Sequence, residues 1–419
     1  MTVAAVRRRS GHPGAVEARQ YDAPVTRGPA GDIVRGAASP GPPSAPTATA
    51  GTDRWRRVLV FSIGSLGDTV LSIPALQALR NHVGPTATIT LLHDDGSLGR
   101  VAPTDVIPAG LVDDSLAFVG PARTTASGRP GTGGAVVTVL RRAAGTGRRS
   151  VGAARLVRRL RHRHFDAVVN LALADRSTRS LRRDRAFFRL AGISTVVGFD
   201  GEAPGRPEAQ ARLERLGPLG VAADLGPGPW YVAADVARHE ADRWRAGAGL
   251  DHRRIATVAP GTLMDAKRWP TERWHALGAR LRTELDLEPV VVGGSADHDE
   301  GDDLVRAWGG GANAAGALSV AGSAALMASA DLHIGVDTGT THLASAAGTP
   351  MVALYSHRAP IRQWAPMGAE QWIVDHPVPC AGCLAVSCPV AGHPCMTGID
   401  VDEVWDRIVA ATERAGSRG

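Results

Sequence analysis

A group of polar residues follows an apolar run, Leu332–Val336, that has the composition of a buried strand. Asp337 comes directly after the run, Thr338 and Gly339 follow it, and His342 lies three residues further on. At a helix start, free backbone N–H groups attract anions such as phosphate, and a carboxylate accepts hydrogen bonds from hydroxyl groups. The pattern therefore predicts a ligand-binding turn, although a helix cap beside a surface histidine would have the same sequence.

A second set of residues that could bind a ligand surrounds Lys267, the one lysine of the chain. Of the 47 lysine and arginine residues, 46 are arginine, so lysine has been replaced almost everywhere. Lysine binds phosphate as a compact charge on a thin stem, whereas arginine is a broad planar fork. Lys267 is therefore a candidate phosphate ligand, with the hydroxyl of Thr262 close by in sequence. Alternatively, this lysine has no special function and has persisted by chance.

A third candidate, Asp68, ends the segment GSLGD at residues 64–68. The segment lies between a strand-like run at 57–63 and a helical pattern that starts at Thr69. Its two glycines let the backbone approach a ligand closely, and the carboxylate could act as a base or cap the helix. It is neither a dinucleotide-binding motif nor a P-loop, because the required glycines and lysine are missing. Pro74 predicts a helix that is kinked there or begins only around it.

Strand and helix patterns alternate along the chain, and this alternation predicts an α/β fold with parallel sheets. Strands are expected at residues 57–63, 88–93, 167–171, 194–199, 255–260, 289–293, 332–336 and 351–355. Helices are expected at residues 150–163, 271–284, 320–329 and 401–414, with Thr271 as the cap of the second.

Two Rossmann-like lobes are expected, facing one another across a cleft, and each has a glycine-bearing loop after its first strand. The first lobe covers residues 54–235 and the second covers 250–400, with a boundary segment that contains Pro, Gly and a helical pattern at 232–245. Residues 401–419 are expected to form a last helix and tail. Residues 1–53 are rich in Pro, Gly, Ala and Thr without apolar periodicity, which predicts a disordered tail.

Nine arginines and no acidic residue occur between Arg141 and Arg163. A helix is expected from Ser150, with apolar residues on one face and arginines around the rest. These arginines predict a solvated face, or contact with an anionic acceptor, an acidic lipid surface or nucleic acid. The preceding stretch, residues 120–150, has the composition of a surface loop.

The sequence has no run of about 18 apolar residues, and no apolar segment follows its basic N-terminus, so neither a membrane span nor a secretory signal is expected. The expected location is the cytoplasm. Peripheral contact with the inner face of the membrane would use the arginine-rich region 141–163.

All four cysteines, Cys380, Cys383, Cys388 and Cys395, lie within sixteen residues, and His393 lies among them. In a cytoplasmic protein this clustering indicates a structural zinc site or a thiol cluster more than disulfides. The spacing differs from that of a standard zinc finger, so the sequence leaves both interpretations open.

Four motifs occur in a recognisable order: GSLGD, PGTLMDAKRWP, VVVGGSADHDE and ADLHIGVDTGTTHLASAAGTPMVALY. In order and spacing they resemble the heptosyltransferase family, the bacterial glycosyltransferase family 9. The cysteine-containing tail, CAGC to GIDVDEVW, also looks like that of many members. The resemblance covers residues 54–415 and weakens over 100–160. It implies a GT-B fold, in which the first Rossmann-like domain binds the acceptor and the second binds the nucleotide sugar.

The resemblance further implies an inverting transfer without a metal or cofactor, from an ADP-heptose-type donor to a hydroxyl of a saccharide or lipid-linked acceptor. In this family Asp68 matches the proposed general base, and Lys267 matches the lysine on the donor phosphates. The other matches are Thr262 as a nearby hydroxyl, Asp337 on the sugar hydroxyls, and Thr338, Gly339 and His342 in the diphosphate-binding turn. The chain departs from the family at Leu263, where some members carry a second hydroxyl.

Inverting glycosyl transfer needs a base on the acceptor hydroxyl and positive potential at the departing diphosphate. A lysine and a helix start supply this positive potential, so the acidic pair Asp297 and Asp299 is interpreted as a helix start and not as a metal site.

Other classes of protein also fit parts of the sequence. One alternative is a nucleotide-sugar-binding protein that kept the second lobe but lost its activity. Another is a nicotinamide-dependent oxidoreductase, but the G-x-G-x-x-G motif that would support it is missing. A nucleic-acid-binding protein would rest on the arginine-rich region alone, so no nucleic-acid partner is expected.

Overall fold

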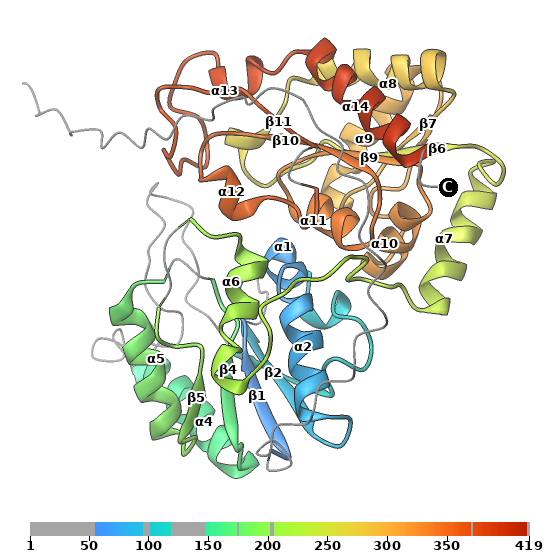
Figure 1. Cartoon of the computed structure of the whole chain (residues 1–419). Coiled ribbons are helices and arrows are strands. Elements are labelled where there is room, and N and C mark those ends of the chain that lie inside the picture. Colours follow the sequence, from blue (N-terminus) through green and yellow to red (C-terminus); the bar gives the residue numbers. More distant parts are fainter. Residues whose placement is uncertain are drawn as a thin grey trace, which may run out of the picture. The chain divides into compact units, whose positions relative to one another are not determined.

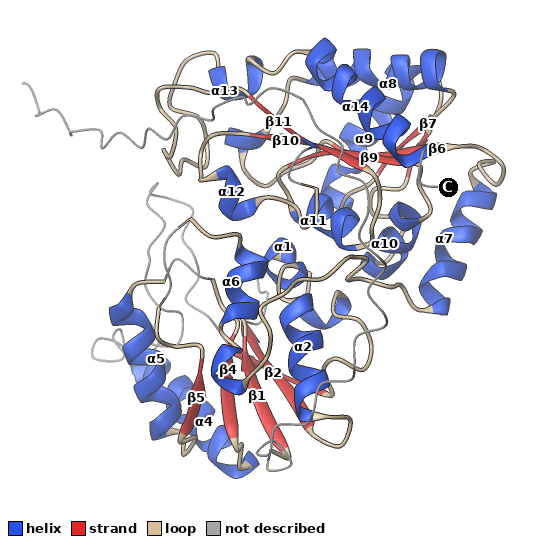
Figure 2. Cartoon of the chain, viewed as in Figure 1, coloured by secondary structure: helices blue, strands red, loops and turns tan. Residues whose placement is uncertain are grey.

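Two parallel sheets form the framework of the protein (Figures 1 and 2). The structure is a computed structural model, and it describes residues 55–94, 101–118, 147–173, 176–201, 205–369 and 372–416. The predicted N-terminal tail and most of the predicted surface loop lie outside these residues. Both sheets belong to one compact unit of the chain, Thr49–Gly419.

The first sheet has the strand order β3-β2-β1-β4-β5, and its strands run parallel. The strands are β1 (Arg57–Phe61), β2 (Thr88–Asp94), β3 (Asp114–Phe118), β4 (Ala167–Asn170) and β5 (Thr195–Val197). The central strands β1 and β4 are buried almost throughout, as their unbroken apolar runs predict. Strand β3 was not predicted, because its DSLAF run alternates exposed and buried residues over only five positions.

The helices of this first lobe are α1 (Leu66–Val70), α2 (Ile73–Val83), α4 (Gly147–Arg163), α5 (Thr178–Leu190) and α6 (Glu208–Glu214), with 3-10 turns at Pro103–Asp105 and Gly217–Leu219. Pro74 lies in the first turn of α2, and α1 ends before it. The helical pattern after the GSLGD segment is therefore two helices, of which the second begins around the proline.

The second sheet has the order β11-β10-β9-β6-β7-β8 and is also parallel. Its strands are β6 (Ile255–Ala259), β7 (Glu288–Val291), β8 (Ala312–Asn313), β9 (Leu332–Val336), β10 (Met351–Tyr355) and β11 (Ile373–Asp375). Strands β6, β9 and β10 are fully buried. The prediction of four strands here was confirmed, and β8 and β11 extend the sheet at its two edges.

The helices of this second lobe are α7 (Asp235–Gly247), α8 (Thr271–Leu285), α9 (His298–Trp308), α10 (Val320–Ala328), α11 (Gly339–Ala346), α12 (Ile361–Trp364), α13 (Pro394–Thr397) and α14 (Val401–Gly416), with 3-10 turns at Asp265–Lys267 and Ser295–Asp297. Helix α7, predicted in the boundary segment, packs against α10 and so belongs with this lobe. Thr271 is the first residue of α8 and Pro270 is its cap residue, so the predicted cap was wrong by one position.

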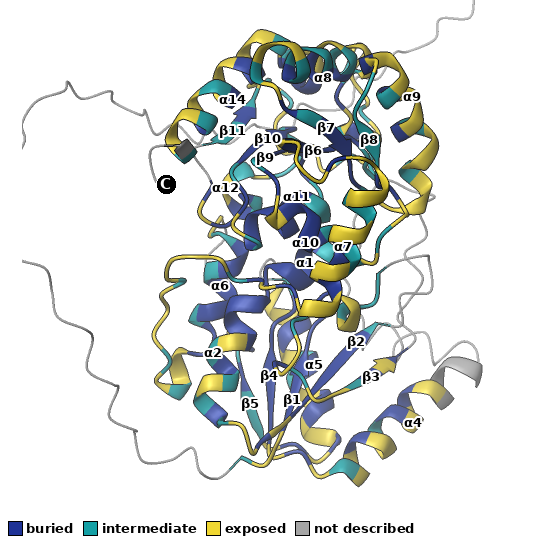
Figure 3. Ribbon diagram, turned by 90° about the vertical axis from the view of Figure 1, so that its right-hand side faces the viewer, coloured by how far each residue is buried: buried dark blue, intermediate teal, exposed yellow. Residues whose placement is uncertain are grey.

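Helix α4 has the two faces that its sequence predicts. Ala153, Leu156 and Leu160 are buried, whereas Arg155 and Arg158 on the other face are exposed (Figure 3). The burial of the apolar stripe holds the helix on the first sheet, and the arginines face solvent. Among the helices that the structure describes, none combines the length and apolar character needed to cross a bilayer.

His333, the second residue of β9, is an unusual core residue. It has no exposed surface, and its Nδ1 lies 3.0 Å from the hydroxyl of Thr257. Burial lowers the pKa of His333 from 6.5 to about 3. The folded protein therefore keeps this ring neutral at a pH where the unfolded chain binds a proton, and the free energy of unfolding must fall as the pH drops from about 6.5 towards 3.

We expect His333 to contribute a loss of about 1.4 kcal/mol in the free energy of unfolding between about pH 7.5 and pH 5.5. Urea unfolding of wild-type protein and of His333→Leu at both pH values measures this contribution. The variant removes the titrating group, while the Thr257 hydroxyl keeps the carbonyl of Leu332 as a partner at 3.3 Å. Equal pH dependence in the two proteins would contradict the assignment.

Candidate active site

The loop after β1 presents the carboxylate of Asp68, which lies in the first turn of α1. Its Oδ2 accepts hydrogen bonds from the backbone N–H of Ser65 at 2.6 Å and from the Ser65 hydroxyl at 2.9 Å. Gly64 makes this arrangement possible, because a Cβ there would lie 2.3 Å from the same Oδ2. Two predicted roles of this residue, helix cap and functional carboxylate, are thus compatible, because Oδ1 is not used by the cap.

Arg212 on α6 also contacts Asp68, and the sequence gave no reason to select it. Its Nη2 lies 3.4 Å from Oδ1 of Asp68, and its Nη1 donates to the backbone carbonyl of the same residue. The Arg212 side chain has no exposed surface, so its charge must be compensated inside the protein. Nothing in the sequence distinguishes this arginine from the 45 others, because only the packing of α6 against α2 brings it to the site.

The carboxyl ends of β6 and β9 place Lys267 beside Asp337. The Nζ atom of Lys267 lies 2.7 Å from Oδ2 of Asp337 and donates to the Asp337 carbonyl at 2.8 Å. Oδ1 of Asp337 lies 3.8 Å from Nε2 of His342. The sequence predicted separate ligands for these two charged residues, whereas the structure joins them in a nearly buried ion pair.

Thr262 lies between β6 and the lysine. Its hydroxyl accepts a hydrogen bond from the backbone N–H of Met264 at 3.2 Å, and so shapes the turn that leads to Lys267. Leu263, where the family pattern allows a second hydroxyl, is 89% exposed. On the other side of this turn, a Cβ on Gly261 would lie 2.2 Å from Oδ1 of Asp297. The acidic residue that the sequence placed only loosely therefore packs directly against the lysine-bearing turn.

Several buried polar atoms at the carboxyl edge of the second sheet lack a hydrogen-bond partner among the described residues. They are the hydroxyl of Thr338, Nδ1 of His342 and the hydroxyl of Ser356. Ser356 directly follows β10, and the pairing of β10 with β9 brings it to the level of Thr338. An unsatisfied buried polar atom is unfavourable, so a polar ligand that pairs with these atoms would be stabilised. The sequence missed Ser356, although its place after a buried parallel strand was the available indication.

The charge state of His342 follows from its surroundings. Burial lowers the pKa of this imidazole below 6.5, more than the carboxylates of Asp337 and Asp68 raise it, and Lys267 and Arg212 lower it further. The ring is therefore neutral at neutral pH. It can offer one hydrogen-bond donor and one acceptor to a ligand, but not a full positive charge.

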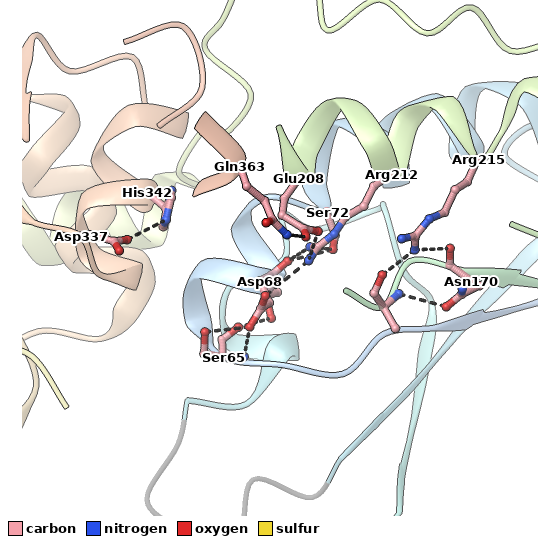
Figure 4. Close-up of polar contacts among 12 residues, drawn as sticks. Ser65, Asp68, Ser72, Asn170, Glu208, Arg212, Arg215, Asp337, His342 and Gln363 are labelled. Carbon is pink, nitrogen blue, oxygen red and sulfur yellow. Dashed lines mark hydrogen bonds and ion pairs between the residues drawn. The ribbon is translucent and has the colours of Figure 1, made fainter. Parts of the chain in front are cut away.

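The two glycine loops, one from each lobe, are in direct contact. A Cβ on Gly67 would lie 2.9 Å from Cδ2 of His342, and a Cβ on Gly339 would lie 2.7 Å from Cβ of Leu66. Figure 4 shows Asp68 on one side of this contact and Asp337 and His342 on the other. The sequence predicted lobes that face one another across a cleft, but at these two loops the lobes touch, and only glycine fits at both positions.

The cysteine-containing segment packs on the turn that carries Lys267. The backbone N–H of Ala266 donates to the carbonyl of Val386 at 2.9 Å, and Nε2 of His393 lies 3.1 Å from the carbonyl of Ala266. The four cysteines are free thiols that line one small cavity with His357 and His393. Among the described residues, no group of three or more His, Cys, Asp or Glu side chains is arranged to hold a metal ion.

Comparison with known proteins gives a consistent result. Residues 223–393 match the family model of glycosyltransferase family 9 (heptosyltransferase). The chain is 26% identical over 243 residues to lipopolysaccharide heptosyltransferase 1 of Pseudomonas aeruginosa, a match that covers 56% of this chain and 66%, just under two thirds, of that relative.

Among solved structures, the chain is similar to a family 9 glycosyl transferase of Veillonella parvula, with a TM-score of 0.62, 18% identity and coverage of 87% of this chain and 99% of that one. It is also similar to E. coli ADP-heptose lps heptosyltransferase II, with a TM-score of 0.54, 16% identity and coverage of 85% and 99%. A third is E. coli heptosyltransferase WaaC with ADP-2-deoxy-2-fluoro heptose, with a TM-score of 0.55, 18% identity and coverage of 84% and 99%.

At these identities the structural matches show the fold, which is the GT-B arrangement of two parallel α/β lobes that the sequence predicted. The segment that matches the family model includes the turn of Lys267 and the loop of Asp337. Over residues 223–393 the chain is therefore similar to glycosyltransferase family 9, the heptosyltransferase family.

Proposed function

We propose that the protein is an inverting, metal-independent glycosyltransferase that moves a heptose or related sugar from an ADP-sugar to a hydroxyl of a saccharide or lipid-linked acceptor. The observation that carries the proposal is the meeting of the two glycine loops. It brings the Asp68 carboxylate of the first lobe to the Lys267, Asp337 and His342 cluster of the second. A base and a diphosphate site must lie this close if both act on one anomeric carbon.

In the proposed step, the acceptor oxygen attacks the anomeric carbon on the face opposite the diphosphate. The new glycosidic bond forms, the bond from that carbon to the β-phosphate oxygen breaks, and the acceptor proton passes to Oδ1 of Asp68. Oδ1 is the suitable oxygen because Oδ2 already accepts two hydrogen bonds from Ser65. Attack from the opposite face inverts the configuration of the anomeric carbon. ADP leaves with both electrons of the broken bond.

The departing diphosphate gains negative charge, and the second lobe supplies positive potential for it. Lys267 contributes a full charge, and the first backbone N–H groups of α11 point to the same edge of the sheet. The hydroxyl of Thr338 and the neutral ring of His342 would complete the site as hydrogen-bond partners. When the donor binds, Lys267 turns from the carboxylate of Asp337 to a phosphate oxygen. Asp337 is then available to accept hydrogen bonds from sugar hydroxyls.

The donor and acceptor classes are supported by the relatives. The P. aeruginosa relative is a lipopolysaccharide heptosyltransferase, and one E. coli structure of the same fold holds an ADP-heptose analogue. A sugar needs room between the reacting groups, and the two glycine loops touch in the present arrangement. Donor binding therefore requires the loops around Gly67 and Gly339 to separate.

Calorimetric titration with a panel of nucleotide sugars tests the proposal. The panel contains ADP-heptose, ADP-glucose, UDP-glucose and GDP-mannose, together with ADP and NADH. We expect ADP-heptose and ADP to bind, and NADH to bind no more tightly than free adenosine. Tight NADH binding with no ADP-sugar binding would support the oxidoreductase instead. A protein that binds ADP-heptose but never releases ADP with any acceptor would be a binding protein without activity.

A further inference from the structure

Beyond the reacting groups, the structure contains a buried chain of polar side chains that starts at Asp68 and crosses from the first lobe to the second (Figure 4). Its members are Arg212 and Glu208 on α6 and Gln363 on α12. The side chains of Arg212 and Glu208 have no exposed surface, and Gln363 is 8% exposed. Burial of so many polar groups is costly, so their partners must be well placed.

Arg212 fixes Asp68 from two directions. Its Nη1 donates to the Asp68 carbonyl and to the hydroxyl of Ser72 at 2.6 Å, and that hydroxyl donates to the same carbonyl at 2.9 Å. Its Nη2 lies 3.4 Å from Oδ1 of Asp68. Arg212 thus holds both the backbone and the proposed proton-accepting oxygen of Asp68.

The same guanidinium also pairs with Glu208. Nη2 of Arg212 lies 3.4 Å from Oε2 of Glu208, the same distance as from Oδ1 of Asp68. One nitrogen therefore lies between two carboxylates, and a small shift would strengthen one contact at the expense of the other. The position of Glu208 consequently decides how closely Arg212 holds Asp68.

Gln363 contacts Glu208 from the opposite lobe. Its Nε2 donates to Oε1 of Glu208 at 2.9 Å, across 155 residues of sequence. This hydrogen bond depends on how α12 lies against α6, whereas the hydrogen bonds and ion pairs described for Arg212 join residues of the first lobe. Separation of the lobes would break it, and their return would restore it.

We propose that Gln363, Glu208 and Arg212 are positioning residues. Through them, the position of the second lobe against the first controls the orientation of Oδ1 of Asp68. When the two lobes are in contact, Gln363 donates to Glu208, and Glu208 pairs with Arg212. Arg212 in turn orients the carboxylate of Asp68. When the lobes separate, Arg212 moves towards Glu208, and the carboxylate of Asp68 is no longer held in its orientation. The proposal rests on the proposed function of Asp68, and it makes proton acceptance depend on the contact between α12 and α6.

The test is Gln363→Met, which keeps the size of the side chain and removes the hydrogen bond. A misaligned base lowers turnover without weakening the donor site, so we expect kcat to fall about 10-fold to 100-fold while the KM for ADP-heptose changes less than about twofold. Gln210→Met is the matched control, because Gln210 lies on α6 beside Glu208 and Arg212, and among the described residues it donates to Glu214 and to the carbonyl of Ala223. Its kcat should equal that of wild type.

A second measurement separates positioning from a general loss of structure. If Gln363 acts through Asp68, then Gln363→Met should have no further effect on the residual turnover of Asp68→Asn. A merely structural contact would instead lower turnover by the same factor in both backgrounds, and this result would overturn the proposal. Unchanged kcat in Gln363→Met would overturn it as well.

Gln363→Asn, in which the amide is one methylene too short to reach Glu208, repeats the test should the methionine variant fold poorly. It should reproduce the fall in kcat and the lack of effect in the Asp68→Asn background. Wild-type turnover is the reference for all variants. Absence of turnover in wild type would mean that the proposed function is wrong, whereas normal turnover in both Gln363 variants would mean that only the connection between the lobes is wrong.

Discussion

Asp68→Asn is expected to lower kcat by about 10²–10⁴-fold, because an amide cannot accept the proton of the acceptor hydroxyl. Donor affinity should change little, since the diphosphate ligands all lie in the second lobe. The amide oxygen can still accept the two hydrogen bonds from Ser65, so α1 should keep its cap. ADP release in the presence of acceptor measures kcat, and calorimetry measures the Kd of the donor.

Asp166→Asn is the matched control for this variant. Asp166 is in the same lobe and also accepts backbone hydrogen bonds, from Arg56 at 2.7 Å and Arg57 at 2.9 Å. It lies before β4, at the opposite end of the sheet from Asp68, and its replacement should leave kcat unchanged. Wild-type turnover in Asp68→Asn would show that another group accepts the proton.

Lys267→Met is expected to reduce kcat/KM for the donor by about 10²–10³-fold, the usual cost of removing one preorganised partner of a developing charge. The Kd of ADP should rise as well, since the lysine is proposed to bind the phosphates before the reaction. The variant also leaves the carboxylate of Asp337, which is 7% exposed, without its cation. The free energy of unfolding should therefore fall, and donor affinity must be measured where the variant is folded.

Arg268→Ala provides the comparison for Lys267→Met. Arg268 is the next residue, is 44% exposed at its side chain and pairs with Glu300 at 3.0 Å. Its loss should leave the Kd of ADP within about twofold of wild type, because exposed ion pairs contribute little. An unchanged Kd in Lys267→Met would contradict the assignment of the lysine to the diphosphate.

The sequence predicted the elements around the second glycine loop closely. Strands β9 and β10 have the expected bounds. Such accuracy was available because short, buried, apolar strands are recognisable from their local sequence alone. Helices α5 and α6 were missed because their charged, arginine-rich sequences resemble loops, and their apolar residues are recognised only once the first sheet is present.

The candidate site was predictable in its parts but not in its connections. Position after a strand selected Asp68 and Asp337, and composition selected Lys267. The ion pair of Lys267 with Asp337 and the contacts of Arg212 and Gln363 could not be predicted, because they join residues 70 to 155 positions apart in the chain. Such pairs exist only after both lobes have folded and met.

The most direct measurement is ADP release from ADP-heptose by the wild-type protein, with and without a saccharide or lipid-linked acceptor. The account predicts acceptor-dependent release of ADP, with a glycosidic bond of inverted configuration in the product. Acceptor-dependent release that gives the retained configuration would contradict the direct displacement assigned to Asp68. Failure to release ADP with any acceptor, from a protein that binds ADP-heptose, would contradict the proposed activity itself.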